Sequence, residues 1–196
     1  MEKKKLIKIY IINIENKSID DILIEYKDYI DKEDIEKSKE YKLEINQKQF
    51  LISTMLKKKY VGKKIYFNEY KKPLSDNIHF NISHSLNRVV IALSKDYNIG
   101  VDIECIKPIE NEKTINYVFN EEEKQYIDNE NKKFYYLWTR KEAILKCNGT
   151  GLINDIKNIN CINDDKYRLF SYYLDNYVMS IAIENNQEDV EVMIEE

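Results

Sequence analysis

Two carboxylates stand two positions apart in the apolar stretch GVDIE, residues 100–104. Residues i and i+2 of a β-strand share a face, so Asp102 and Glu104 are expected to point the same way. Two carboxylates in a partly buried place repel each other unless a cation lies between them, and Mg²⁺ favours such oxygen ligands. The pattern therefore predicts a metal site or, alternatively, an edge strand whose polar face meets water. Gly100 either gives the strand room beside a ligand or shapes the turn after Asn98.

A second charged group lies in WTRKEAILK, residues 138–146, where apolar residues recur at helical spacing. Glu142 and Lys146 are four residues apart and share one helix face, with Lys141 beside them. In one interpretation Glu142 is a third metal ligand and the two lysines contact phosphate. The other is an exposed ion pair with little effect on stability.

A third segment, FNISHS at residues 80–85, ends an apolar strand with His84 between two serines. An imidazole, hydroxyls and backbone N–H groups at such a corner can bind an anion. The alternative is a histidine that only occupies a turn.

In this order and spacing, the segments resemble the 4′-phosphopantetheinyl transferases of the Sfp-like group over roughly residues 70–152. The motifs that carry the resemblance are KP at 72–73, FNISHS at 80–85, GVDIE at 100–104, KPI at 107–109, a phenylalanine followed by acidic residues at 119–123, and WTRKEAILKCNGTGL at 138–152. Each motif alone is weak, whereas the combination is specific.

The resemblance implies an α+β fold, a pseudo-dimer of two similar lobes with the active site in the cleft between them. We expect an N-terminal lobe over residues 1–104 and a C-terminal lobe over 105–196. The implied reaction transfers the phosphopantetheine arm of coenzyme A to a serine of an apo acyl or peptidyl carrier protein and releases adenosine 3′,5′-bisphosphate. Mg²⁺, or alternatively Mn²⁺, would serve as the metal. A coenzyme A-binding scaffold without turnover and a Mg²⁺-dependent phosphoester hydrolase are the alternative functions.

The resemblance also assigns roles to individual residues. It implies metal binding by Asp102, Glu104 and Glu142, phosphate contacts by Lys141 and Lys146, further coenzyme A contacts by Ser83 and His84, and an adenine-side segment at Lys72 and Pro73. Lys146 would also stabilise charge during transfer. The base would be Glu123 or, by a different count, Glu122, and we prefer Glu123.

Two segments of the sequence depart from the family pattern. Lys71 stands where the family often has glycine before KP, and NQKQF at 46–50 lacks an arginine that often binds the 3′-phosphate, so Lys37 or Lys48 would replace it. The family docks its carrier on the segment after GVDIE. Apolar residues there would serve either docking or packing between the lobes: Ile106, Ile109, Tyr117 and Val118.

Composition narrows the classes of protein. The 196 residues are 43% hydrophobic and 34% charged, and the net charge of −4 gives no overall basic field for nucleic acid. No apolar stretch is long enough to span a membrane. Three cysteines without a CxxC motif favour a reduced, cytoplasmic protein, expected to be a monomer.

Periodicity predicts the elements that position these residues. We expect helices over 18–30, over 31–60 with a break near DKED, and over 131–148, and two short helical segments between 109 and 129. Predicted strands cover 6–14, 64–70, 78–83, 88–94, 98–106, 158–162, 167–174 and 177–184. The acidic tail from residue 185 is expected to be partly ordered.

Overall fold

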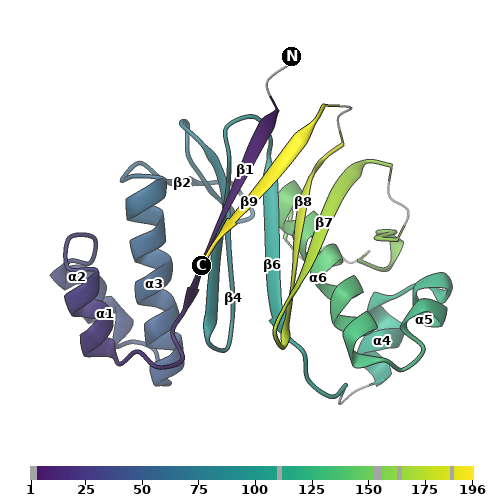
Figure 1. The fold of residues 1–196 in the computed structure, drawn as a ribbon, viewed down its shortest axis with the longest axis horizontal. Coiled ribbons are helices and arrows are strands. Elements are labelled where there is room, and N and C mark those ends of the chain that lie inside the picture. Colours follow the sequence, from purple (N-terminus) through teal and green to yellow (C-terminus); the bar gives the residue numbers. More distant parts are fainter. Residues whose placement is uncertain (1–3, 110–111, 152–155, 163–164, 186–187) are drawn as a thin grey trace.

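The computed structural model describes residues 4–109, 112–151, 156–162, 165–185 and 188–196. Its elements form four layers, with two small sheets face to face in the middle and helices on both outer sides; Figure 1 shows α3 and α6 on opposite sides of the sheets. This mixed α+β architecture confirms the predicted fold class. No helix within these ranges is long and apolar enough to cross a membrane.

The first sheet has the order β4-β5-β1-β9 and carries the N-terminal helices on its outer face. Its strands are β1 (Lys5–Asn13), β4 (His79–Ser85), β5 (Arg88–Ser94) and β9 (Val190–Glu195), and the helices are α1 (Ile19–Glu25), α2 (Lys32–Ser38) and α3 (Glu44–Tyr60). Ser18 caps α1 as predicted, and the break at DKED occurs because Asp31 caps a new helix, α2.

The second sheet has the order β6-β8-β7 and packs on the C-terminal helices. Its strands are β6 (Ile99–Cys105), β7 (Tyr167–Leu174) and β8 (Tyr177–Glu184). The helices are α4 (Glu112–Val118), α5 (Glu121–Ile127) and α6 (Asn131–Asn148), followed by the 3-10 turn η1 (Ile156–Asn158). Two short strands, β2 (Tyr66–Phe67) and β3 (Pro73–Leu74), pair with each other. Helix α6 has the bounds that its periodicity predicts and ends at Gly149, which adopts φ 69°.

An apolar core lies between the sheets and explains which way the carboxylates of β6 point. Val101 and Ile103 are fully buried there against residues of β1, such as Ile9. Because side chains alternate along a strand, Asp102 and Glu104 face the opposite way, toward α6. Strand β6 is an edge strand of its sheet, but Asp102 is only 4% exposed, so the alternative of a polar face meeting water does not hold.

Gly100 shares the face of Asp102 and lies directly beneath α6. A Cβ atom placed on it would be 2.0 Å from the carbonyl oxygen of Ala143 and 2.4 Å from the amide nitrogen of Cys147. Neither ligand space nor turn geometry explains this glycine. It allows the backbone of α6 to approach β6, and so brings Glu142 and Lys146 to the carboxylates of the strand.

Two predicted strands differ from the structure. Residues 158–162 form no strand, and only Tyr66 and Phe67 of the strand predicted over 64–70 are paired. The acidic tail contains β9, which pairs in parallel with β1. The predicted lobe boundary at residues 104 and 105 falls near the end of β6, and strands pass across it: β6 lies in the sheet of β7 and β8, while β9 joins the N-terminal sheet.

Candidate active site

Carboxylates from β6 and α6 meet beside the end of β4. Asp102, Glu104 and Glu142 line a cavity of about 280 Å³ together with side chains of β4 and Lys146. The Lys146 ammonium donates hydrogen bonds to Asp102 Oδ1 at 2.6 Å and to Ser83 Oγ at 3.0 Å. Lys146 therefore pairs with the strand rather than forming an exposed pair with Glu142 on its own helix.

The cavity carries excess negative charge. Burial is the main cause that raises the pKa of Glu104 and of Glu142, and the charge of Asp102 acts in the same direction. Lys146 opposes both shifts but is itself committed to Asp102. His84 lies at the rim, and desolvation together with Lys146 lowers its pKa.

The donor set of this cavity would suit a divalent cation that takes further ligands from outside the protein. Asp102 Oδ2 is buried and has no hydrogen-bond partner among the described residues, so this oxygen is available to bind a cation. No three carboxylate, histidine or cysteine side chains of the described residues are close enough to hold a metal alone. Mg²⁺ commonly binds through one or two carboxylates plus substrate phosphates and water, and Asp102 and Glu104 provide such a partial site.

A second cavity, of about 300 Å³, continues from the first. Glu142 and Lys146 line both cavities, and Lys72, Pro73 and Gly149 also line the second. The two cavities form one groove, which we call the carboxylate groove. The structure thus brings together these residues of the predicted site: Lys72, Pro73, Ser83, His84, Asp102, Glu104, Glu142 and Lys146.

The groove residues of β6 and α6 lie in a segment that matches a known family. Residues 98–189 match the family model described as the 4′-phosphopantetheinyl transferase superfamily. This segment, somewhat less than half of the chain, is similar to that superfamily. The resemblance that the motifs predict is therefore confirmed for this part of the chain.

Curated members of the superfamily show the same partial match. The 4′-phosphopantetheinyl transferase gsp of Aneurinibacillus migulanus is 38% identical over 90 residues, which cover 43% of this chain and 38% of the relative. Sfp of Bacillus subtilis strain 168 is 37% identical over 91 residues, covering 43% and 40%. AcpT of Salmonella typhi is 38% identical over 76 residues, covering 36% and 40%. The chain thus matches about two fifths of the length of these relatives.

Lys72 lines the second part of the groove, but its ammonium is bound to protein groups. The side chain is buried and donates hydrogen bonds to Asn98 Oδ1 at 2.7 Å and to the Cys147 carbonyl at 2.8 Å. Burial lowers the pKa of Lys72. The ammonium instead binds a carbonyl in the last turn of α6, where the helix dipole favours a cation.

Glu123 and Lys141, the predicted base and phosphate ligand within the superfamily segment, form an ion pair away from the groove. Their charged atoms are 2.8 Å apart and both side chains are fully buried. The Lys141 ammonium also donates to the Ile156 and Ile159 carbonyls, and Glu123 completes the N-terminal cap of α5. Neither residue lines the groove, so the geometry gives no support to the predicted roles.

The other predicted lysines also lie elsewhere. Lys48 pairs with Glu44 at 2.6 Å, and Lys37 lines a separate cavity beside Phe50. Glu122, the alternative base, is exposed on α5 and is not among the residues that line the groove.

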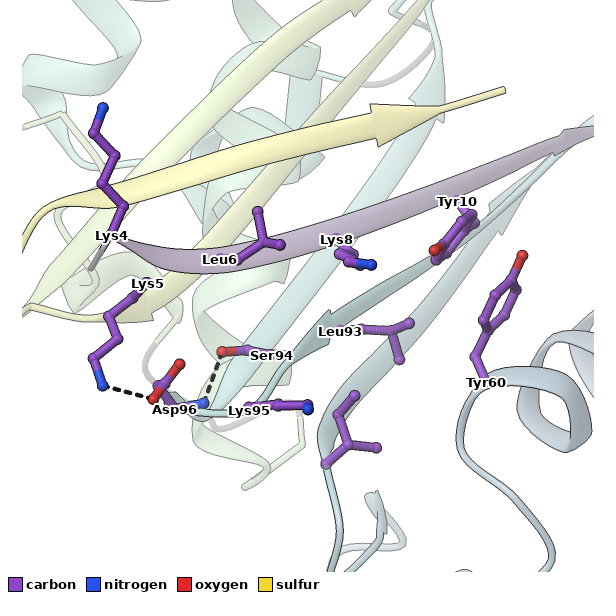
Figure 2. A pocket seen from close by; sticks show the side chains of 11 residues that line it. Lys4, Lys5, Leu6, Lys8, Tyr10, Tyr60, Leu93, Ser94, Lys95 and Asp96 are labelled. Carbon is purple, nitrogen blue, oxygen red and sulfur yellow. Dashed lines mark hydrogen bonds and ion pairs between the residues drawn. The ribbon is translucent and has the colours of Figure 1, made fainter.

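A larger cavity of about 620 Å³ lies at one end of β1 and β5, as Figure 2 shows. Tyr10 and Tyr60 stack there with ring centroids 4.0 Å apart, and Lys5 pairs with Asp96 at 2.7 Å. None of the predicted site residues lines this cavity. Volume alone would have placed the site away from the carboxylates.

Ser85 is a site residue that the predictions omit. Its hydroxyl donates a hydrogen bond to Glu104 Oε2 at 2.6 Å. The signal was present in the sequence, because Asn81, Ser83 and Ser85 are polar at every second position, with the apolar Phe80 and Ile82 in the same strand.

Proposed function

We propose that the chain is a 4′-phosphopantetheinyl transferase that moves the arm of coenzyme A onto a serine of an apo acyl or peptidyl carrier protein. The observation that carries the proposal is the carboxylate groove. Within the superfamily segment, three carboxylates and Lys146 converge on one groove, which runs on to the KP segment at Pro73. A pyrophosphate needs cations and positioned donors, and this groove offers both.

The metal-binding residues in this proposal are Asp102 and Glu104, with Glu142 across the groove. Mg²⁺, when bound there, would neutralise charge on the pyrophosphate as a Lewis acid. The unpartnered Asp102 Oδ2 and the raised pKa values of Glu104 and Glu142 support a cation in this place. Mn²⁺ accepts the same oxygen ligands.

Two residues of α6, Glu142 and Lys146, would take part in the transfer step. The carrier serine oxygen bonds to the phosphorus of the arm as the pyrophosphate P–O bond breaks, and adenosine 3′,5′-bisphosphate leaves with the bonding electron pair. Lys146 lies on the groove and would stabilise charge on the transferring phosphate. Glu142 would take the serine proton, since it lines both parts of the groove, whereas Glu123 is held by Lys141.

Coenzyme A would lie along the groove with its adenine toward Pro73 and its phosphates toward Ser83 and His84. The carrier would approach near α4, where Tyr117 is 65% exposed. Val118 is only 3% exposed and packs in the core, which favours packing rather than docking for this residue.

We place the enzyme in the cytoplasm as a monomer, in keeping with its three free, buried cysteines.

An intact-mass assay tests the proposal. Purified protein, coenzyme A and Mg²⁺ are incubated with a panel of apo carriers from fatty-acid, polyketide and peptide synthesis. The expected result is a carrier whose mass rises by that of the phosphopantetheine arm, and only when Mg²⁺ is present. No gain with any carrier would contradict the proposal. Tight coenzyme A binding without transfer would indicate a scaffold, and phosphate release without a carrier would indicate a hydrolase.

A further inference from the structure

The facing edges of the two sheets are joined by side chains of β4. Asn81 Oδ1 accepts the backbone N–H of Val101 at 2.9 Å, and Ser85 Oγ accepts that of Cys105 at 3.1 Å. Between them, Ser83 Oγ accepts the N–H of Ile103 at 3.4 Å. Three polar side chains at period two therefore satisfy the edge of β6 that β8 leaves unpaired.

Two of these three side chains also hold the carboxylates. Ser83 Oγ donates to Asp102 Oδ1 at 2.9 Å, and Ser85 Oγ donates to Glu104 Oε2 at 2.6 Å. Each hydroxyl thus binds a carboxylate and the backbone amide that follows it. A hydroxyl that donates one hydrogen bond and accepts another has a fixed orientation, and it therefore fixes the orientation of the carboxylate that it binds.

The two carboxylates depend on their serines to different degrees. Asp102 is short, almost fully buried and held by Lys146 as well as by Ser83. Glu104 has a longer, half-buried side chain, and Ser85 is its hydrogen-bond donor in the described part of the chain. Removing the Ser85 hydroxyl would leave Glu104 free to rotate away from Asp102, whereas Asp102 would keep Lys146.

We propose that Ser85 is a positioning residue, which holds Glu104 in the orientation that lets it share a divalent cation with Asp102. This rests on the proposed function of the groove. Ser85 would touch neither metal nor substrate and would act through the carboxylate. Such supporting hydrogen bonds commonly change metal affinity by about 10- to 100-fold when they are lost.

Direct metal binding distinguishes positioning from a purely structural role. The measurement is the dissociation constant of Mn²⁺, followed by electron paramagnetic resonance with coenzyme A present and corrected for Mn²⁺ bound by coenzyme A alone. Ser85→Ala should raise this constant by about 10- to 100-fold. Ser85→Thr keeps the hydroxyl and should restore wild-type binding. If the alanine variant does not fold, Ser85→Cys tests the same loss with a weaker donor.

Ser94→Ala is the matched control, because it removes a buried hydroxyl that accepts the backbone N–H groups of Asp96 and Tyr97 and that does not line the groove. It should lower the melting temperature and leave the Mn²⁺ dissociation constant unchanged. A Ser85→Ala protein that binds Mn²⁺ as wild type does would overturn the positioning role while arm transfer by the wild type still stands. A wild type that neither binds Mn²⁺ with coenzyme A nor transfers the arm would overturn the proposed function as well.

Discussion

The Lys141 ammonium lies 2.8 Å from the Glu123 carboxylate, and neither side chain has any exposed surface. The pair joins α5 to α6, and through the Ile156 and Ile159 carbonyls it also holds the chain that follows α6. Lys141 precedes Glu142 in sequence, so this buried anchor fixes the rotation of α6 and turns Glu142 toward the groove.

Breaking this pair should destabilise the protein strongly. Lys141→Met leaves the Glu123 carboxylate buried without its cation, a change that typically costs about 3–5 kcal/mol. Urea denaturation measures the loss in the free energy of unfolding. Replacing both residues with apolar ones should cost less than the sum of the single changes. The control is Lys39→Met, which removes an exposed pair with Glu36 and should cost about 1 kcal/mol or less.

Gly100→Ala should displace α6, because the new methyl group would be 2.0 Å from the Ala143 carbonyl oxygen. Overpacking of a core typically costs about 1–3 kcal/mol, and contact with backbone rather than with a flexible side chain places this change at the upper end. Arm transfer should fall further than stability alone explains, since α6 carries Glu142 and Lys146. Wild-type stability and turnover would show that α6 does not lie against β6 as described.

The groove also predicts how Mg²⁺ affects stability with pH. Burial raises the pKa of Glu104 and Glu142 above the ordinary value of 4.5, so the two groups favour the folded state at low pH, and this contribution is lost as pH rises through the folded pKa. A bound cation compensates for the lost protons. Mg²⁺ should therefore raise the melting temperature where both carboxylates are ionised, and the effect should fade as pH falls through their raised pKa and protons compete.

Asp102→Asn provides the control for this experiment. It removes one charge of the groove and should abolish the Mg²⁺-dependent rise in melting temperature. An equal rise in wild type and variant would place the cation elsewhere on the protein.

Sequence pattern predicted which faces meet, and it did so for physical reasons. Asp102 and Glu104, two residues apart in a strand, share one strand face, and Glu142 and Lys146, four residues apart in a helix, share one helix face. Strand and helix geometry fix both relations locally, so the sequence alone predicts them. The hydrogen bond between Lys146 and Asp102 joins two elements far apart in sequence, and only the close approach at Gly100 brings it about.

The buried lysines show where sequence could not decide. The resemblance implied that Lys72 and Lys141 lie at the ligand, but their ammonium groups bind buried carbonyls. A lysine has a long apolar stem, so its ammonium can reach either a ligand or buried carbonyls from one backbone position. The choice depends on the carbonyls of Cys147, Ile156 and Ile159, whose positions follow from the tertiary fold.

Exposed Tyr117 on α4 offers a test of carrier docking. Tyr117→Ala should raise the KM for the apo carrier several-fold and leave the KM for coenzyme A unchanged, because an exposed aromatic side chain at an interface loses contact area when truncated. Tyr173→Ala is the control, since Tyr173 is also exposed but lies on β7. Equal effects of the two changes would argue against docking at α4.

Lys146 is the cation paired with the groove carboxylate Asp102, and its loss should affect turnover more than binding. Lys146→Ala should lower the rate of arm transfer by about 100- to 1,000-fold if the ammonium stabilises charge that develops only during transfer. Lys133→Ala, on the first turn of the same helix and paired with Glu130 at 2.8 Å, is the control and should transfer at the wild-type rate. Rates come from intact-mass time courses at saturating coenzyme A, with melting temperatures recorded for both variants, because Asp102 loses its ion pair with Lys146. A lysine that served only to neutralise Asp102 would leave the rate close to that of wild type once Mg²⁺ is saturating.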